Sequence, residues 1–458
     1  MPADPQTRPA GLDPRRLAAF QARESRRFAK ARPRTRALLD RGARAWLAGV
    51  PMHWMRDWPS PFPLVVSQAE KARLTDADGF GIDDFCLGDT GSMFGHSPAP
   101  VARAIRRQAR RGLTYMLPSE AALRAGLLLQ AMFGPLVWQL ATTATDANRN
   151  ALRVARAVTG RRKVLVFNGA YHGTLQDTMV ALQDGQTVAR QGLVGQVFDI
   201  AAEAVCIEFN DLAALEAVLA SGEVAAVLTE PVLTNSCMVL PEPGFHDTLR
   251  ALTRAYGTLL ILDETHTLSS GLGGYARGAG LEPDLYVVGK CVAGGLATAV
   301  WGMTGAVAER FAAYDAARPS GHSGMGTTLS GNPLQFAALE ATLAEVMTEA
   351  AYDHMERGAA RLAAGLGAAI ARRALPWHVV RVGARVEFIC APGPLKNGTE
   401  AAAAHQPQVE AALHLGLLNR GCLIAPFHNM MLVSPLTKKR QIDRLIAAFD
   451  EILTELTR

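Results

Sequence analysis

Two residues with complementary chemistry, Asp263 and Lys290, each follow a short apolar run in the middle of the chain. The runs cover 259–262 and 285–288, and the two residues lie 290 − 263 = 27 positions apart. Short apolar runs bounded by turn residues are typical of buried parallel strands, and an open α/β sheet binds ligands beyond the carboxyl ends of its strands. A lysine can form a Schiff base and a carboxylate can pair with a pyridinium nitrogen. The pair thus has the two groups that a pyridoxal phosphate (PLP) site needs, although an acid and an amine that merely end two strands would explain the pair alone more simply.

The elements around this pair alternate between strand and helix patterns. Strand-like runs at 163–167 and 224–229 precede the run that leads to Asp263, and helical spacing occupies 147–159 and 244–256. Strands that alternate with helices favour a doubly wound, mostly parallel sheet. We therefore predict an α/β fold with a large sheet domain that carries both chemical groups.

Two further segments carry residues suited to a phosphorylated, planar ligand. Thr143, Ala144 and Thr145 stand where a helix is expected to begin, and free N–H groups at a helix start favour a phosphate. An ordinary helix cap explains the threonines equally well. Tyr171 follows the run at 163–167, where an aromatic ring could stack on a planar ring.

The two ends of the chain have sequence patterns that differ from the strand–helix alternation of its middle. Residues 12–48 have helical spacing, and an aromatic, proline-rich connector at 51–63 should run as an irregular loop. A long helix is expected from about 333 to 372, and 377–458 alternates strands with helices. The predicted domains are 1–75, the N-terminal part of a small domain, then 76–335, the large PLP-binding domain, and 336–458, the C-terminal part of the small α+β domain.

Composition narrows the class of protein. The 458 residues are 49% hydrophobic and 19% charged, which suits a compact protein with a large core. The net charge of +5 is scattered, without a basic stripe interleaved with aromatics, so we expect no nucleic-acid partner. We also expect no membrane segment, because no apolar run has spanning length, and no metal, because the histidines lack ligand spacing. Six dispersed cysteines without a CxxC pair suggest reduced thiols in a cytoplasmic enzyme.

Eight motifs in a fixed order resemble those of one enzyme family. The chain is similar, over about residues 50–457, to the class III, fold type I PLP-dependent aminotransferases, within the glutamate-1-semialdehyde aminomutase-like group. The motifs are Pro118-Ser-Glu, Thr143-Ala-Thr-Asp-Ala, 151–161, Gly169-Ala-Tyr-His-Gly, Glu230-Pro-Val, Asp263-Glu-Thr-His-Thr, Gly289-Lys290 and Thr328-Leu-Ser-Gly-Asn-Pro.

The resemblance implies a role for each matching residue. Lys290 would form the Schiff base and later carry the proton, Asp263 would keep the pyridine nitrogen protonated, and Tyr171 would stack on the ring. Thr328 would reach the phosphate bound by a second subunit, which implies a homodimer with its active site at the interface. The other implied cofactor contacts are His172 beside Tyr171, Thr265 on the opposite ring face, Asn235 at the polar edge, and Thr143, Ala144 and Thr145 at the phosphate. His266 is expected to be a packed histidine behind the reacting groups.

Three departures from the family pattern bear on the substrate. His53 stands where the aminomutases place an arginine, Thr90 replaces a bulky tryptophan, and 425–431 lacks an expected glutamate. These changes argue against glutamate-1-semialdehyde as substrate. They favour a ping-pong aminotransferase with a wide pocket that moves an amino group from a primary amine or (β-)amino acid donor to a carbonyl acceptor. Candidate substrate contacts are His53, Trp54, Arg56, Thr90 and His428, with Arg385 and Asn429 as further options.

Several other functions remain open at this point. An aminomutase, a racemase or a PLP lyase would use the same lysine and cofactor. A non-catalytic binding module is disfavoured, because binding alone requires neither Lys290 nor Asp263. A nicotinamide-dependent dehydrogenase has little support, since no GxGxxG follows a first strand.

Overall fold

The chain forms two compact units in the computed structural model, which describes residues 9–426 and 428–457. The sheet unit comprises Pro98–Tyr352 and Leu395–Ala403, and the terminal unit comprises Met1–Ser97, Asp353–Pro394 and Ala404–Arg458. The two divisions therefore fall 97 − 75 = 22 and 352 − 335 = 17 residues beyond those expected from the sequence. The first difference arises because strands near residue 80 pair with a C-terminal strand of the terminal unit.

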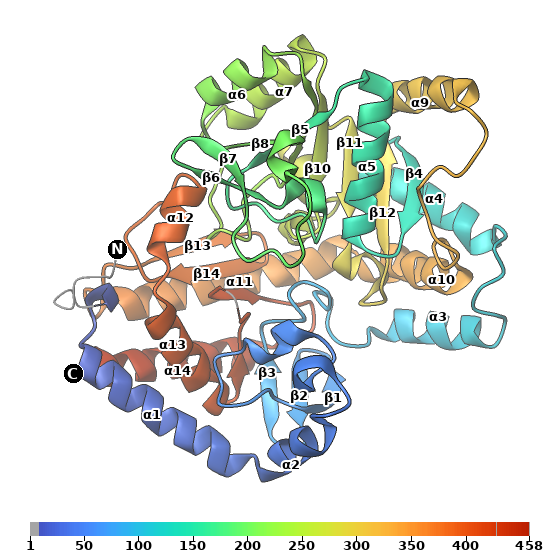
Figure 1. The fold of residues 1–458 in the computed structure, drawn as a ribbon. Helices are drawn as coiled ribbons and strands as arrows, with labels where there is room; N and C mark the ends of the chain where they lie inside the picture. The colour runs from blue at the N-terminus through green and yellow to red at the C-terminus, as the bar shows by residue number, and fades with distance from the viewer. Residues whose placement is uncertain (1–8, 427, 458) are drawn as a thin grey trace. The chain divides into compact units, whose positions relative to one another are not determined.

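A seven-stranded sheet forms the centre of the sheet unit (Figure 1). Its order is β4-β12-β11-β10-β9-β5-β8, and every neighbouring pair is parallel except the two that β12 makes with β11 and β4. The strands are β4 (Val137–Ala141), β5 (Lys163–Phe167), β8 (Ala204–Ile207), β9 (Val224–Thr229), β10 (Leu259–Asp263), β11 (Leu285–Val288) and β12 (Ala299–Met303). This sheet confirms the predicted α/β class.

Helices and one hairpin complete the sheet unit. Strands β9, β10 and β11 are buried along their whole length, as expected for parallel strands that are covered on both faces. The other elements are α3 (Ala99–Ala109), α4 (Glu120–Phe133), α5 (Ala144–Thr159), β6 (Val180–Gln183), β7 (Gln186–Ala189), α6 (Leu212–Leu219), α7 (Phe245–Ala255), α8 (Gly274–Ala279), α9 (Gly305–Ala317), α10 (Pro333–Ala341) and α12 (Gly398–Ala404).

Helix α5 packs on the large sheet and begins at its carboxyl edge, beside the candidate functional residues. It packs against β9, β11 and β12 (Figure 1), through small and branched side chains such as Ala147, Ala151 and Val154. Thr143 caps its first turn by accepting a hydrogen bond from the Asp146 amide at 3.2 Å. Gly160, in the left-handed conformation, ends it. The helix start is thereby fixed at the sheet edge that carries the functional residues.

Two small sheets, four helices and most of helix α11 (Glu349–Ala371) make up most of the described part of the terminal unit. One sheet has the order β1-β2-β3-β15 and the other the order β13-β14-β16. Apolar side chains such as Phe20, Phe388 and Phe449 form the core. The strands are β1 (Val66–Glu70), β2 (Arg73–Asp76), β3 (Gly81–Asp84), β13 (His378–Val382), β14 (Arg385–Ile389), β15 (Cys422–Leu423) and β16 (Met430–Leu432), and the helices are α1 (Pro14–Ala31), α2 (Pro33–Gly42), α13 (Pro407–Asn419) and α14 (Lys439–Thr457).

The single long helix expected from 333 to 372 is wrong. Helix α10 ends at Ala341, a π-helical turn covers Thr342–Val346, and α11 runs over Glu349–Ala371. Met347, at φ −79° and ψ 82°, leaves the helical region. A π turn adds a residue to the helical ladder, and such turns commonly bend a helix. Alanine-rich spacing on both sides hides this break in the sequence.

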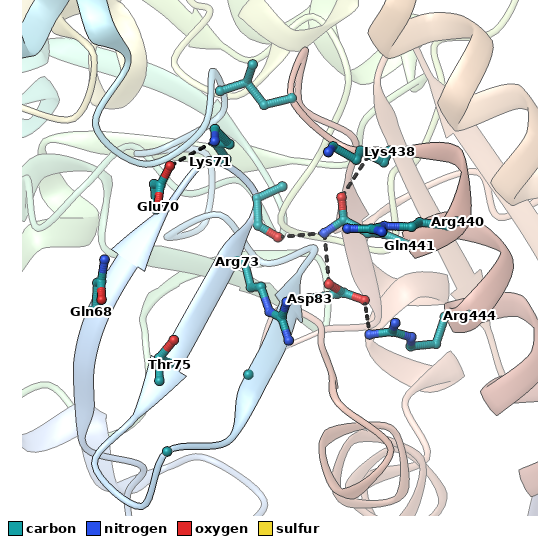
Figure 2. Close-up of a pocket in the computed structure, with 14 residues that line it drawn as sticks. Gln68, Glu70, Lys71, Arg73, Thr75, Asp83, Lys438, Arg440, Gln441 and Arg444 are labelled. Carbon is teal, nitrogen blue, oxygen red and sulfur yellow. Dashed lines mark hydrogen bonds and ion pairs between the residues drawn. The ribbon is translucent and has the colours of Figure 1, made fainter.

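A polar hollow of about 470 Å³ in the terminal unit lies beside the start of α14 (Figure 2). There Asp83 accepts hydrogen bonds from Gln441 Nε2 at 2.9 Å and from Arg444 at 2.7 Å. Gln441 also donates to the Ala72 carbonyl at 3.1 Å and accepts from the Lys438 amide at 2.8 Å. The buried polar groups of this hollow bond one another, so they fix α14 against β2 and β3.

Candidate active site

Asp263 and Lys290 lie at the same edge of the large sheet. Strands β10 and β11 are parallel neighbours, with Asp263 opposite Val287. Asp263 is the last residue of β10, and Lys290 opens the 3-10 helix Lys290–Ala293 directly after β11. Lys290 has φ 52°, in the left-handed region that costs a side-chain-bearing residue free energy. Backbone strain at a chemically reactive side chain is typical of functional sites.

Asp263 is buried at the centre of a hydrogen-bond network. Its Oδ2 accepts from His172 Nδ1 at 3.0 Å and from Asn148 Nδ2 at 2.8 Å, and its Oδ1 accepts from the Thr265 amide at 3.1 Å. Burial raises the pKa of this carboxyl, but His172 and the other donors outweigh burial and lower the pKa to about 2. The carboxylate therefore stays ionised at neutral pH and is suited to hold a protonated ring nitrogen.

The start of α5 adjoins the turn that carries Lys290. A Cβ on Gly289 would lie 2.8 Å from the Ala144 Cβ, so only glycine lets the two segments approach this closely. The Gly289 amide donates to Thr265 Oγ1 at 3.2 Å, which ties this turn to the loop after β10. Three segments predicted from the sequence, around Ala144, Thr265 and Lys290, are thus brought together.

The first turn of α5 presents features that suit an anion. Thr145 Oγ1 accepts from the Thr174 amide at 3.1 Å, and a Cβ on Gly173 would lie 2.1 Å from that oxygen. Asp146 would repel a phosphate, but its carboxylate accepts from Arg149 at 2.6 Å and from Thr143 Oγ1 at 2.9 Å. An engaged carboxylate beside amide groups at a helix start is compatible with a bound phosphate.

The remaining predicted cofactor contacts lie in three places. Tyr171 follows β5 and is 41% exposed, whereas its neighbour His172 is buried against Asp263. Asn235 Nδ2 lies 3.3 Å from Glu230 Oε1 and 3.4 Å from His266 Nδ1. Thr328 is exposed in the loop that precedes α10.

His266 is buried, as the sequence predicts, and its direct contact with Lys290 is a feature that was not predicted. Its Nε2 is hydrogen-bonded to Lys290 Nζ, and its Nδ1 lies 2.6 Å from Thr234 Oγ1. Asn148, which holds Asp263, was not predicted either. Its signal was available, because it lies at the start of the predicted helix, four residues after Ala144.

The candidate substrate contacts belong to the terminal unit. His53, Trp54 and Arg56 are exposed, on a short 3-10 helix over His53–Arg56 within the connector expected to be irregular. Thr90 and Arg385 are fully buried and hydrogen-bonded to each other.

The candidate His428 and the further option Asn429, from the same unit, are buried in polar surroundings. His428 Nδ1 lies 3.5 Å from Glu387 Oε1, and Asn429 accepts from His414 Nε2 at 3.0 Å. Asn429 is thus hydrogen-bonded within the unit and His428 lies near the Glu387 carboxylate, in contrast to the exposed residues of the 3-10 helix.

No group of three or more histidine, cysteine or acidic side chains in the described part of the chain could hold a metal ion. Among residues 9–426 and 428–457, no helix is long and apolar enough to cross a membrane. All six cysteines are buried free thiols.

The chain belongs to the class III aminotransferases. The family described as "Aminotransferase class-III" matches residues 55–453. This membership confirms the resemblance noted in the sequence, and the family is PLP-dependent, which confirms the expected cofactor.

Named relatives agree with this family. A glutamate-1-semialdehyde 2,1-aminomutase from Sorangium cellulosum is 34% identical over 430 residues, covering 92% of this chain and 96% of its own. A structure of a glutamate-1-semialdehyde-aminomutase from Pseudomonas aeruginosa PAO1 is 49% identical with a TM-score of 0.95, covering 97% of this chain and 100% of its own. A lysine-to-alanine variant of that protein was solved in complex with PMP. A β-phenylalanine aminotransferase from Variovorax paradoxus is 26% identical with a TM-score of 0.83, covering 96% and 97%.

The solved relatives also bear on the fold. Their similarity confirms the large, mostly parallel sheet of fold type I.

Proposed function

We propose that this chain is a PLP-dependent enzyme that relocates the amino group of a small-molecule amine, with Lys290 as the reactive amine. The observation that carries the proposal is the convergence of Lys290, the ionised Asp263 and the start of α5 at one sheet edge. A lysine, an ionised carboxylate and the amides of a helix start are three groups that suit PLP.

Each residue contributes a distinct physical task. Bound PLP supplies an electron sink that makes a proton beside the substrate nitrogen acidic. Lys290 Nζ binds the cofactor and then takes and returns that proton. Asp263 keeps the ring nitrogen protonated, and His172 and Asn148 hold Asp263 in place. The further proposed contacts are Thr143, Ala144 and Thr145 at the phosphate, Tyr171 and Thr265 on the ring faces, and Asn235 at its polar edge.

Transfer within one molecule, as in an aminomutase, is the candidate that the named relatives favour. Both the relative of 34% identity and the solved structure of 49% identity carry the aminomutase name. The name of the first describes movement of an amino group from C2 to C1 of glutamate-1-semialdehyde.

Transfer between two molecules, as in an aminotransferase, is the second candidate. His53, Thr90 and the segment 425–431 depart from the aminomutase pattern, and the β-phenylalanine aminotransferase shows that a related chain uses a different amine. A wide pocket with His53, Trp54, Arg56, Thr90 and His428 as substrate contacts belongs to this candidate.

One experiment separates these candidates. The PLP-loaded chain is given glutamate-1-semialdehyde alone, and a panel of amines with and without a keto acid, and the products are identified by mass spectrometry. An aminomutase yields an isomer without any acceptor, whereas an aminotransferase yields a carbonyl product only as fast as the acceptor is consumed. Racemised amine or a released fragment would indicate a racemase or lyase. Lys290→Ala should abolish every reaction, and a chain that never binds PLP would overturn the proposal.

We also propose that the chain acts as a cytoplasmic homodimer whose active sites lie at the interface. Supporting this, α4 and the segment before it expose large apolar side chains, namely Leu113, Tyr115, Met116, Leu117, Leu123 and Leu127. Exposed apolar patches commonly mark protein interfaces. Thr328 would then reach the phosphate of the second subunit, and six free thiols fit a reducing compartment.

A further inference from the structure

We propose that His266 is a positioning residue that holds the free amine of Lys290, and that Thr234 and Glu230 fix His266 in one tautomer. The inference rests on the proposed function, in which Lys290 is the reactive amine. It assigns roles to three buried side chains, His266, Thr234 and Glu230, that have no task in the proposed function.

The four residues form a continuous chain of hydrogen bonds, which we call the lysine relay. Lys290 Nζ bonds to His266 Nε2, His266 Nδ1 lies 2.6 Å from Thr234 Oγ1, and Thr234 Oγ1 bonds to Glu230 Oε2. Lys290 follows β11, His266 follows β10, and Thr234 and Glu230 follow β9, which are three adjacent parallel strands. Since the carboxyl ends of these strands meet at one edge, the fold itself assembles the relay.

The relay lies almost entirely out of contact with water. Glu230, Thr234 and His266 are buried, and Lys290 is half-buried. A buried polar group without a partner is costly, so the bonds between these side chains are strongly favoured. Asn235 Nδ2, which lies 3.4 Å from His266 Nδ1, donates to the second Glu230 oxygen, Oε1, at 3.3 Å.

The donors and acceptors of the relay fit in one direction when Glu230 is ionised. The carboxylate can only accept, so the Thr234 hydroxyl donates its single hydrogen to Glu230. Thr234 Oγ1 then accepts from His266 Nδ1–H, which leaves the Nε2 lone pair facing Lys290. Lys290 Nζ donates to that lone pair. The side chain of lysine is otherwise flexible, so this bond gives its amine a fixed place.

Protonation of Glu230 would reverse this direction. Burial raises the pKa of Glu230, the charge of His172 and the Thr234 bond lower it, and the nearby Asp263 charge raises it, with a net raised pKa. A neutral Glu230 donates to Thr234, Thr234 donates to His266 Nδ1, and His266 Nε2–H then points at Lys290. The titratable groups that bear on the relay are thus Glu230 and Lys290 at its ends, with His172 and Asp263 acting on Glu230.

The test follows PLP capture by the cofactor-free, full-length chain, measured by rapid-mixing absorbance over a range of pH. Capture depends on the placement of the Lys290 amine and needs no substrate. His266→Ala and Thr234→Val should slow capture about 10-fold or more, because a misplaced amine attacks poorly. Thr234→Ser keeps the hydroxyl and should behave like the unchanged chain.

Glu230→Gln tests the direction of the bonds. The Gln amide donates to Thr234 as neutral glutamic acid would, so His266 Nε2–H faces Lys290 and no longer accepts from its amine. Capture should therefore slow in Glu230→Gln, and its pH profile should lose any step caused by Glu230 itself. Should this variant fail to fold, the Thr234→Val and Thr234→Ser pair, which changes little volume, still decides the inference.

The outcomes separate the relay from the proposed function. Unchanged capture rates and pH profiles in His266→Ala and Thr234→Val, with capture lost in Lys290→Ala, would overturn the relay alone. Equal slowing in Thr234→Val and Thr234→Ser would also overturn it, because packing rather than the hydroxyl would then be responsible. Absence of PLP capture by the unchanged chain would instead overturn the proposed function.

Discussion

At the scale of single residues, the charge of Asp263 is maintained by its three hydrogen-bond donors. His172 and Asn148 converge on Oδ2, and the Thr265 amide bonds to Oδ1. In an apolar interior an isolated carboxylate would take up a proton. The donors reverse that tendency and so keep the group ready to hold a positive charge.

The lowered pKa of Asp263 predicts a pH-dependent contribution to stability. The pKa of Asp263 is about 2 in the folded chain and 3.8 for the free carboxyl. The ionised carboxylate therefore stabilises the fold above pH 3.8, and this stabilisation is lost as the pH falls towards 2. The full effect is roughly 2 kcal/mol, of which roughly half is lost at pH 3. The difference in unfolding free energy between the unchanged chain and Asp263→Asn should shrink accordingly between pH 6 and pH 3. A difference that stays constant would contradict this account.

The close approach of Gly289 to Ala144 predicts a specific pair of effects. Gly289→Ala should push the start of α5 away from Lys290 and weaken PLP binding at least several-fold, because its Cβ would lie 2.8 Å from that of Ala144. Adding Ala144→Gly removes the opposing methyl group and should restore most of the affinity. Equilibrium titration with PLP measures both variants. If the double variant binds no better than Gly289→Ala, the crowding explanation is wrong.

At the scale of elements, the contact between α11 and α14 depends on one small residue. A Cβ on Gly365 would lie 2.4 Å from Ile446 Cδ1 and 2.7 Å from its Cγ1, so the side chain could not simply swing aside. Gly367, two residues along the same helix, has no atom within 4 Å of such a Cβ. The two positions form a matched pair within one element.

These glycines predict opposite effects of the same substitution. Gly365→Ala should destabilise the chain by about 1–3 kcal/mol through overpacking. Gly367→Ala should stabilise it by about 0.5–1 kcal/mol, because alanine restricts the unfolded chain and favours helix. Chemical unfolding of both full-length variants measures the two effects. Equal effects would show that the α11–α14 contact is not tight at Gly365.

The elements that carry the chemistry were predictable, whereas those without a distinctive pattern were not. Strands β9, β10 and β11 are continuous apolar runs that end in polar residues, so Asp263 and Lys290 could be placed at one edge. Strand β12 is equally apolar but follows a glycine-rich turn, and its antiparallel pairing leaves no sequence signal. The break between α10 and α11 was hidden by uniformly helical composition.

The same limit applies to the candidate site. Lys290, Asp263 and Ala144 belong to motifs with a fixed order, and the structure brings their segments together. The contact of His266 with Lys290 depends instead on how the loops after β10 and β11 turn towards each other. Backbone directions of this kind are set by tertiary packing and cannot be obtained from spacing alone.

At the scale of the whole molecule, the exposed surface of α4 predicts assembly. Leu123 and Leu127 lie one turn apart and are 71% and 70% exposed. Leu123→Glu with Leu127→Glu should convert the proposed dimer to monomers, because the two introduced carboxylates would be buried at the interface without positively charged partners. Sedimentation velocity measures the change, with the exposed Val197→Glu as a control that should leave assembly intact. A chain that is monomeric without any substitution would contradict the proposed dimer.

The burial of the cysteines has a practical consequence for fluorescent labelling of this enzyme. All six thiols are buried, and burial raises the pKa of Cys206 and of Cys422 to about 12. Because the thiolate is the reactive form, native thiols should react with maleimide dyes only as fast as the chain opens. A cysteine introduced at one exposed position, such as Val197, would then be the one rapid labelling site. A fluorescent dye that reports conformational motion could therefore be attached at an introduced cysteine without first replacing the six native ones.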